Sequence, residues 1–215
     1  MGFEKSATGV VITDPQNDFL SEHGVAWGLV EESVVENNTI GNIERLMKVA
    51  KANGVGVFVS PHYYFPTDHD WQFDGMVEKM MHEIHMFDRG AALSLDNFAG
   101  SGADWLERYK PLIEEGKTVI ASPHKVYGPE NNDLVLQLRK RGVSKVIVAG
   151  MSANLCVEAH VREFLEQGFE VTVAKDATAG ARHPELGDGY QSALVNFGYL
   201  ASSVVTTDET VASLS

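Results

Sequence analysis

The chain has 215 residues, of which 44% are hydrophobic and 22% are charged, and its formal net charge at pH 7 is −13. This length suits one α/β domain with a substantial core, and the ordinary composition argues against extensive disorder. The negative charge argues against nucleic acid or an anionic membrane surface as a partner, because both attract a positive field. No apolar run approaches the roughly 18 residues that span a bilayer.

Cys156 is the only cysteine, so no disulfide can form within the chain. The opening residues lead almost directly into a predicted strand and lack the layout of a signal peptide. We therefore expect a reducing, cytoplasmic environment. A lone cysteine is more often a small buried apolar residue than a nucleophile, so its neighbours must decide its role.

Apolar, β-branched runs alternate with segments of helical periodicity along the chain. Strands are predicted, in chain order, at residues 8–13, 56–60, 118–122, 145–149, 170–174 and 203–206. Helices are predicted at residues 33–52, 74–85, 103–112, 132–141, 154–167 and 186–197. Such alternation implies right-handed crossovers and a parallel sheet with helices on both faces. We therefore predict a single three-layer α/β domain over residues 1–215.

Ligands of such sheets bind beyond the carboxyl ends of the strands. The residues expected there are Asp14, His62, the pair His124-Lys125, the segment 150–156 and Asp176. Position alone thus selects an acid, a base and the only thiol of the chain.

The segment 150–156 joins a predicted strand to a predicted helix, and Ser152 or Asn154 is a natural N-cap. Cys156 then falls in the first helical turn, where the helix dipole lowers the pKa of a thiol. The free backbone N–H groups of that turn can receive an oxyanion. The alternative, that Cys156 packs inward beneath the helix, stays open on this pattern alone.

Asp14 can accept the proton of the thiol and return it to a leaving amine. Lys125 can lower the pKa of the thiol and stabilise the carboxylate as a cation. Taken singly, the two are more typical of a turn aspartate and a surface lysine. Their coincidence with Cys156 at adjacent strand ends favours a catalytic interpretation.

Four segments carry a pattern that extends from about residue 8 to residue 206. They are Asp14-Pro15-Gln16-Asn17-Asp18-Phe19, Lys125 after the third strand, Gly150-Met151-Ser152-Ala153-Asn154-Leu155-Cys156-Val157, and Asp176-Ala177-Thr178-Ala179. In this order they resemble the D-x-Q-x-D-F, lysine, G-x-x-T-x-x-C-V and D-A-x-A motifs of the isochorismatase-like cysteine hydrolases. That superfamily includes isochorismatases, nicotinamidases, carbamoylsarcosine amidohydrolases and biuret hydrolases.

The resemblance implies a six-stranded parallel sheet in the order 3-2-1-4-5-6 and a catalytic triad of Asp14, Lys125 and Cys156. It also implies a cis peptide bond between Met151 and Ser152, which turns backbone N–H groups toward an oxyanion. A homo-oligomer, dimer or tetramer, is expected from the habits of the superfamily. No cofactor is expected.

A bound metal is not expected either. Nicotinamidases bind one through a D-x-H…H motif after the second strand, where this chain has Ser60-Pro61-His62 and so lacks the carboxylate. Whether His62 and His69, or His82 and His85, bind a metal elsewhere stays open at this point.

The predicted activity is hydrolysis of a C–N bond in a small amide or ureido compound through a thioester intermediate. Cys156 favours this chemistry, since isochorismatases that cleave a vinyl ether often lack the cysteine. Vinyl-ether hydrolysis with Asp14 as the acid, and a non-catalytic binding protein on the same fold, remain the alternatives. The expected partner is a small-molecule substrate, and the residues expected at its pocket are Gln16, Phe19, Trp27, His62 and Tyr63.

Overall fold

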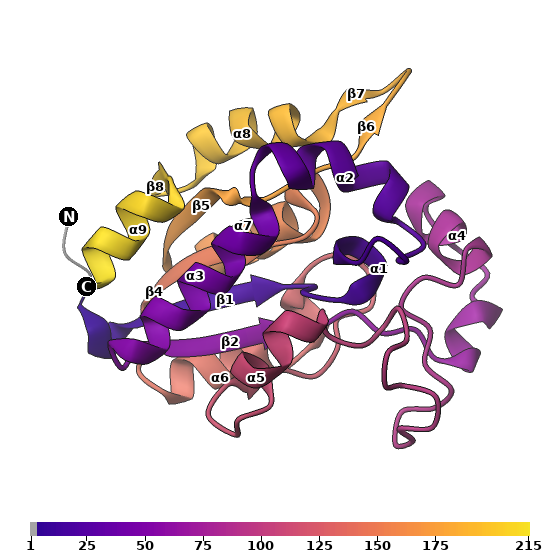
Figure 1. The fold of residues 1–215 in the computed structure, drawn as a ribbon, viewed down its shortest axis with the longest axis horizontal. Helices are drawn as coiled ribbons and strands as arrows, with labels where there is room; N and C mark the ends of the chain where they lie inside the picture. The colour runs from indigo at the N-terminus through magenta and orange to yellow at the C-terminus, as the bar shows by residue number, and fades with distance from the viewer. Residues whose placement is uncertain (1–3) are drawn as a thin grey trace.

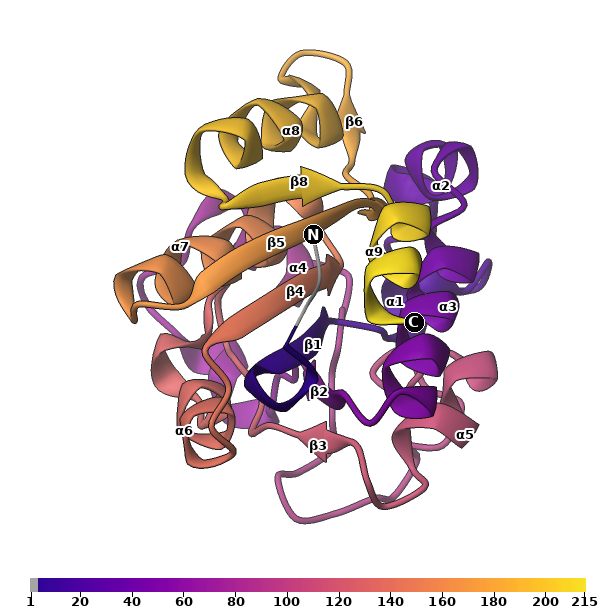
Figure 2. The same ribbon diagram turned by 90° about the vertical axis from the view of Figure 1, so that its left-hand side faces the viewer.

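A computed structural model describes residues 4–215 and places a six-stranded parallel sheet between two layers of helices (Figures 1 and 2). The strands of this sheet are β1 (Thr8–Thr13), β2 (Gly56–Ser60), β3 (Val119–Ile120), β4 (Lys145–Gly150), β5 (Glu170–Thr178) and β8 (Ser203–Val205). Their spatial order is β3-β2-β1-β4-β5-β8, which confirms the predicted fold class and strand order. The sixth strand is β8 because a two-stranded antiparallel ribbon, β6 (Arg182–His183) and β7 (Gly187–Asp188), precedes it.

The central strand β1 is buried along its whole length. Val10 pairs with Val57 of β2 on one side and with Ile147 of β4 on the other. Because helices cover both faces as well, a strand in this position has no solvent-facing side. This explains why its sequence is a continuous apolar run rather than an alternating one.

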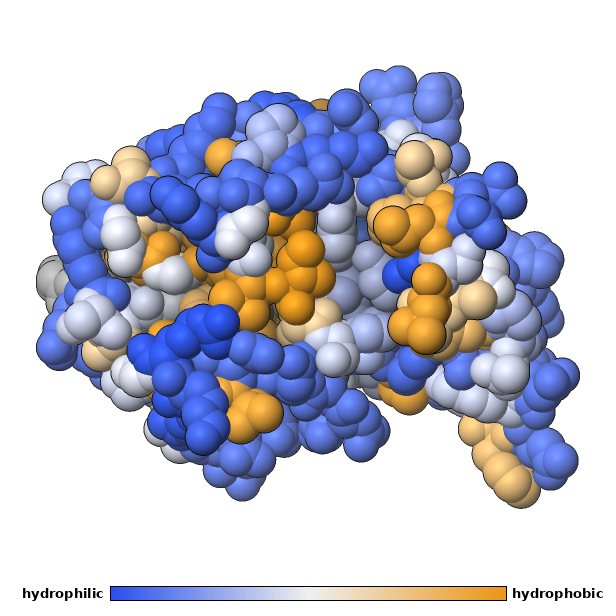
Figure 3. Space-filling model, turned by 90° about the horizontal axis from the view of Figure 1, so that it is seen from below, coloured by the Kyte–Doolittle hydropathy of each residue, from blue (hydrophilic) through white to orange (hydrophobic). Residues whose placement is uncertain are grey.

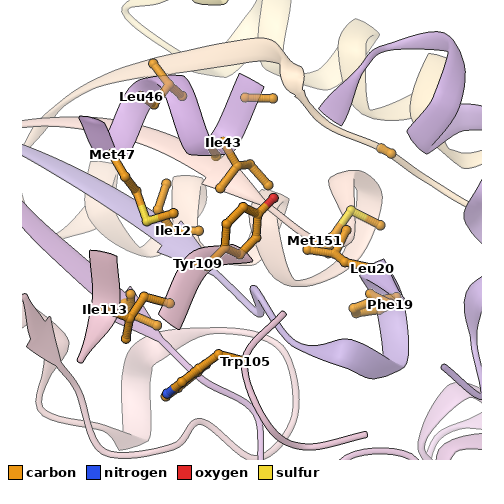
Figure 4. Close-up of a cluster of buried hydrophobic side chains, with 14 of the residues drawn as sticks. Ile12, Phe19, Leu20, Ile43, Leu46, Met47, Trp105, Tyr109, Ile113 and Met151 are labelled. Atoms are coloured by element: carbon orange, nitrogen blue, oxygen red, sulfur yellow. The ribbon is translucent and has the colours of Figure 1, made fainter. Parts of the chain in front are cut away.

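Successive side chains of β1 supply two separate cores, since a strand alternates its faces. Ile12 points to the face covered by α2 (Trp27–Glu36), α3 (Thr39–Ala52), α5 (Lys110–Ile113) and α9 (Thr207–Leu214). Figure 4 shows this core, with Ile43, Leu46 and Met47 of α3 around Ile12. Val11 points to the other face, which is covered by α6 (Leu134–Lys140), α7 (Glu158–Glu166) and α8 (Gly189–Leu200).

The remaining elements are short and lie mainly beyond the carboxyl ends of the strands. They are α1 (Asn17–Leu20), α4 (Met76–Glu83), a π-helical turn (Ala153–Val157) and 3-10 turns at Lys5–Ala7, Pro66–Asp70, Glu107–Tyr109 and Pro129–Asn131. In Figure 1, α1 and α4 lie on the side of the molecule to which the β1 and β2 arrows point.

Two predicted helices differ from those observed, and two observed elements have no predicted counterpart. The helix predicted at 33–52 is two helices, because Asn38 adopts a left-handed φ of 50° that interrupts the right-handed helix. The helix predicted at 103–112 is reduced to a 3-10 turn and α5, whose Pro111 lies in the first turn, where the missing N–H is tolerated. The helix α9 and the ribbon of β6 and β7 were not predicted.

Asp176 was expected after the fifth strand but lies within β5. Its Oδ1 atom accepts hydrogen bonds from the backbone N–H of Thr207 at 2.6 Å and from the hydroxyl of Thr207 at 2.8 Å. Asp176 therefore fixes the start of α9 to the sheet and is not part of the candidate site.

The face of the molecule seen from below in Figure 3 is mostly hydrophilic, with apolar atoms gathered in a few separate areas. Large apolar side chains that are more than two thirds exposed include Phe73, Met76, Leu93, Leu95 and Leu186. Within residues 4–215, no helix combines the length and the apolar character needed to cross a lipid bilayer. The predicted homo-oligomer stays a prediction.

The α3 side of the core should carry much of the stability of the fold. Leu46 is fully buried, so Leu46→Ala should lower the free energy of unfolding by about 2–5 kcal/mol. Leu136 of α6 is 55% exposed, so the matched variant Leu136→Ala should change it by less than about 0.5 kcal/mol. Chemical denaturation of the two variants measures both values, and equal losses would contradict this view of the core.

Candidate active site

Four side chains meet beyond the carboxyl ends of the central strands. Asp14 directly follows β1, and His62 and His124 form an isolated parallel bridge beyond β2 and β3. Cys156 lies in the π-helical turn that follows β4. Each of the four offers one atom of a kind that can bind a metal: a carboxylate oxygen, an imidazole nitrogen or a sulfur. These atoms all lie within 4.8 Å of one another. All four residues are buried, so the sheet gathers them away from bulk water.

Asp14 is held in an unusual conformation at the centre of this group. Its φ of 47° lies in the left-handed region, which residues other than glycine seldom occupy, although aspartate and asparagine tolerate it better than most. Its backbone N–H donates to the carbonyl of Ser60 at 3.0 Å. Its Oδ1 atom accepts from Nε2 of His124 at 2.7 Å, because an ionised carboxylate can only accept. The second oxygen, Oδ2, is buried without a hydrogen-bond partner and is therefore free to receive a proton.

The Cys156 side chain faces Asp14 and is almost fully buried. Burial raises the pKa of the thiol well above its ordinary value, and the neighbouring Asp14 carboxylate raises it further. The backbone N–H groups of Ser152 and Cys156 act in the opposite direction, but more weakly. The expectation of a lowered thiol pKa is thus wrong, since desolvation outweighs the favourable field at the start of the helix.

Lys125 does not join this group. Its ammonium donates to the carbonyl oxygen of Tyr63 at 2.9 Å, forms an ion pair with Asp68 and lies 3.7 Å from the centre of the Phe65 ring. Consecutive side chains of an extended segment point in opposite directions, so the neighbour that faces Asp14 is His124. The structure brings Asp14 and Cys156 together, as expected, but has His124 where Lys125 was expected.

The turn between β4 and Cys156 depends on a glycine. Gly150 has a φ of 115°, and a Cβ atom added to it would lie 2.0 Å from the carbonyl oxygen of Thr13. The next peptide bond, Met151–Ser152, is cis. The N–H of Met151 donates to the same Thr13 carbonyl at 2.9 Å, and its side chain packs into the core near Leu20 (Figure 4). Ser152 thereby lies at the wall of a cavity beside Cys156.

His160 supports the turn from beneath, a role that the sequence did not suggest. Its Nδ1 atom donates to the carbonyl of Cys156 at 2.6 Å, because a carbonyl can only accept. Burial lowers the pKa of His160 to about 3, so the ring is neutral and Nε2 accepts from the hydroxyl of Ser60 at 2.8 Å. The amide of Asn132 donates to the same hydroxyl at 3.3 Å. The only available signal was the spacing of four residues between Cys156 and His160.

A cavity of about 60 Å³ opens beside Cys156. Its wall contains Phe19 and Val30, a set of three methionines from α4 and the segment after it, and Tyr127, Ser152 and Leu155. The methionines are Met80, Met81 and Met86. Within residues 4–215 no charged side chain lines this cavity, so it suits a small neutral group.

Of the five residues expected at the pocket, only Phe19 lines the cavity. His62 belongs to the buried group around Asp14. Gln16 is structural, since its amide donates to the carbonyl of His62 at 2.9 Å and accepts from its N–H at 2.9 Å. Trp27 lies at a different hollow, and Tyr63 is buried in the core with Arg89 stacked over its ring. Gln16, Trp27 and Tyr63 therefore do not line the cavity.

A second polar group lies nearer the surface. Asp88 accepts from Nε2 of His69 at 2.8 Å and from Nδ1 of His85 at 2.9 Å, and the three residues offer ligand atoms within 4.8 Å. The His82 ring lies 4.6 Å from that of His69. A metal could be held here only at the expense of both hydrogen bonds of Asp88.

Comparison with known proteins places the chain in a family. Residues 8–209 match the model of the isochorismatase domain. The chain is 24% identical over 221 residues to the ureidoacrylate amidohydrolase RutB of Methylorubrum extorquens, a match that covers 99% of this chain and 86% of that protein. It is 33% identical over 78 residues to the uncharacterised isochorismatase family protein YddQ of Bacillus subtilis, which is 36% of this chain and 42% of that protein.

Solved structures show the same fold. A cysteine hydrolase from Pseudomonas syringae pv. phaseolicola 1448A superposes with a TM-score of 0.79 at 22% sequence identity, over 100% of this chain and 95% of that one. Because the family model also covers nearly the whole sequence, the chain belongs to the isochorismatase family of hydrolases.

Proposed function

We propose that this protein is a cysteine amidohydrolase that cleaves the C–N bond of a small amide or ureido compound through a thioester on Cys156. The observation that carries the proposal is the buried contact between the Cys156 thiol and the Asp14 carboxylate at the wall of an apolar cavity. Similarity to RutB, a ureidoacrylate amidohydrolase, supports cleavage of a C–N bond.

The first half of the reaction is the attack of the thiol on the substrate carbonyl. Burial keeps the thiol of Cys156 protonated at rest, so the proton must leave as the sulfur attacks. The free Oδ2 atom of Asp14 accepts that proton while the C–S bond forms. The backbone N–H groups of Ser152 and Cys156 face the sulfur, and the oxyanion that develops beside it can accept hydrogen bonds from them.

The second half releases the products. Asp14 returns its proton to the departing nitrogen as the C–N bond breaks, which leaves a thioester on Cys156. A water molecule then attacks the thioester and gives a proton to Asp14, which passes it to the thiolate leaving group. His124 donates to Oδ1 throughout, and thereby leaves Oδ2 available for proton transfer.

We propose that His124 is the third member of the catalytic triad, in place of Lys125. His124 contacts the carboxylate directly, whereas the ammonium of Lys125 is engaged by Asp68 and the carbonyl of Tyr63. Lys125 then has a structural role, since it attaches the Pro66–Asp70 turn to the end of β3.

The cavity supports a neutral substituent on the substrate. A carboxylate placed among Phe19, Val30 and the three methionines would be buried without an ion-pair partner, which is costly. A small, uncharged, partly apolar amide or ureide fits better. The homo-oligomer and the cytoplasmic location remain predictions from sequence.

Cys156→Ala tests the proposal directly. The variant should fold normally but lose several orders of magnitude in kcat, because the nucleophile has gone. Release of ammonia or amine from a panel of small amides and ureides measures the rate, and circular dichroism checks the fold. Full activity of Cys156→Ala on these amides would contradict the thioester. Vinyl-ether hydrolysis with Asp14 as the acid predicts instead that Cys156→Ala stays active on a vinyl ether.

The raised thiol pKa should be visible as slow alkylation at neutral pH. A thiol with a raised pKa stays protonated, so the rate with iodoacetamide should rise only above the ordinary thiol value of about 8.5. Asp14→Asn removes a charge that raises this pKa, so its profile should shift toward lower pH. Mass spectrometry reports a single alkylated site, since Cys156 is the only cysteine. A wild-type profile centred below 8.5 would show that the thiol is not buried as described.

His124 and Lys125 form a natural pair of test and control. His124→Ala should lower kcat by about 10²- to 10³-fold, which is the usual size of a lost acid–base partner. Lys125→Met keeps the apolar stem and should lower kcat by less than about 10-fold, with its main effect on the melting temperature. A larger loss of kcat in Lys125→Met than in His124→Ala would return Lys125 to the triad.

A further inference from the structure

The buried group formed by Asp14, His62, His124 and Cys156 contains several acceptor atoms that receive no hydrogen bond. The Nε2 atom of His62 lies 3.0 Å from the carbonyl oxygen of Lys125, which can only accept, so Nε2 carries the ring proton. The Nδ1 atom of His62 therefore carries a lone pair, and it is buried without a partner. Oδ2 of Asp14 and Nδ1 of His124 are buried without partners as well.

Unpartnered acceptors in a fully buried place are costly unless something electropositive satisfies them. Each of the four residues offers one ligand-type atom, and these atoms lie within 4.8 Å of one another: a carboxylate oxygen of Asp14, one ring nitrogen of His62, one ring nitrogen of His124 and the sulfur of Cys156. Zinc takes this donor set with bonds of about 2.0–2.3 Å, which separates tetrahedral ligand atoms by roughly 3.3–3.8 Å. To bind the cation, His124 also has to exchange its hydrogen bond to Asp14 for a bond to the metal.

We propose that Asp14, His62, His124 and Cys156 form a site for Zn²⁺ or a divalent cation of similar softness, and that the bound cation stops hydrolysis by holding the sulfur of Cys156. Ser60, which stands at the position of the carboxylate of the D-x-H metal motif, is not part of this site. The inhibitory half of this proposal rests on the proposed function, whereas the binding half does not.

The binding step is balanced without any redox change. The S–H bond of Cys156 breaks, its proton passes to solvent, and the sulfur donates its electron pair to the cation. The thiolate and the Asp14 carboxylate together carry two negative charges, which the cation neutralises within the buried site. His62 contributes the lone pair of Nδ1, and His124 contributes a ring nitrogen once its hydrogen bond to Asp14 is broken.

Cobalt provides a readout that does not depend on activity. The full-length protein, treated with a chelator and desalted, is titrated with Co²⁺ while its absorption spectrum is recorded. A thiolate-to-cobalt charge-transfer band in the near ultraviolet should grow to one equivalent and disappear when Zn²⁺ is added. Cys156→Ser should abolish the band. A spectrum without this band, or a band that survives in Cys156→Ser, would overturn the site.

Histidine variants locate the remaining ligands. His62→Gln should weaken the affinity for Co²⁺ by about 10-fold or more, whereas His69→Gln, in the separate group around Asp88, should leave the band unchanged. If His62→Gln fails to fold by circular dichroism, His124→Asn takes its place with the same expectation. An unchanged affinity in the folded His62 or His124 variant, or loss of the band in His69→Gln, would overturn the assignment of the ligands.

The inhibitory half is tested on the hydrolytic assay. Zn²⁺ at one equivalent should abolish turnover, and a chelator should restore it. Full turnover with Zn²⁺ bound would overturn inhibition while leaving the site in place. If no amide or ureide is hydrolysed at all, the proposed function fails, but the cobalt band still decides whether the cation binds.

Discussion

The hydrogen bond between Asp14 and His124 is the interaction on which the site depends. Both side chains are fully buried, and a carboxylate without such a partner would cost several kcal/mol in this position. The bond also ties the end of β1 to the residue that follows β3, across the end of β2, where His62 pairs with His124. The left-handed backbone of Asp14 is kept in place by the same set of contacts, because its N–H is fixed to the carbonyl of Ser60.

Burial determines the protonation state of the Cys156 thiol. The thiol of Cys156 is kept neutral by its surroundings, so it does not depend on a stored thiolate. A neutral thiol is a poor target for oxidants and for adventitious electrophiles, because the thiolate is the reactive form. In the proposed mechanism, the thiol becomes reactive only when a carbonyl compound in the cavity allows attack and proton transfer to Asp14 to proceed together. The apolar wall favours this by excluding water, which would otherwise solvate the carboxylate.

How much of this could be predicted from the sequence depends on the range of the interactions. The strands were predictable because β1 and β4 are largely apolar runs. Asp14 was predictable because it follows β1 directly, and Cys156 because it lies in the turn that joins β4 to the next helix. The sequence could not show that His124, rather than Lys125, contacts Asp14, since this depends on which of two adjacent side chains faces inward. The thiol pKa and the three cavity methionines were not predictable either, because both result from packing against distant segments of the chain.

A proton and a divalent cation make opposite demands on the same lone pairs. Hydrolysis needs the thiol proton on Cys156 at rest and a free oxygen on Asp14 to receive it, whereas a bound cation needs the thiolate and that same oxygen together. Binding of the cation releases the thiol proton, so its affinity must rise as the pH rises. The histidines therefore matter in two ways. In the proposed mechanism His124 keeps Asp14 oriented for proton transfer. The Nδ1 atom of His62, which the proposed hydrolysis does not use, favours binding of the cation.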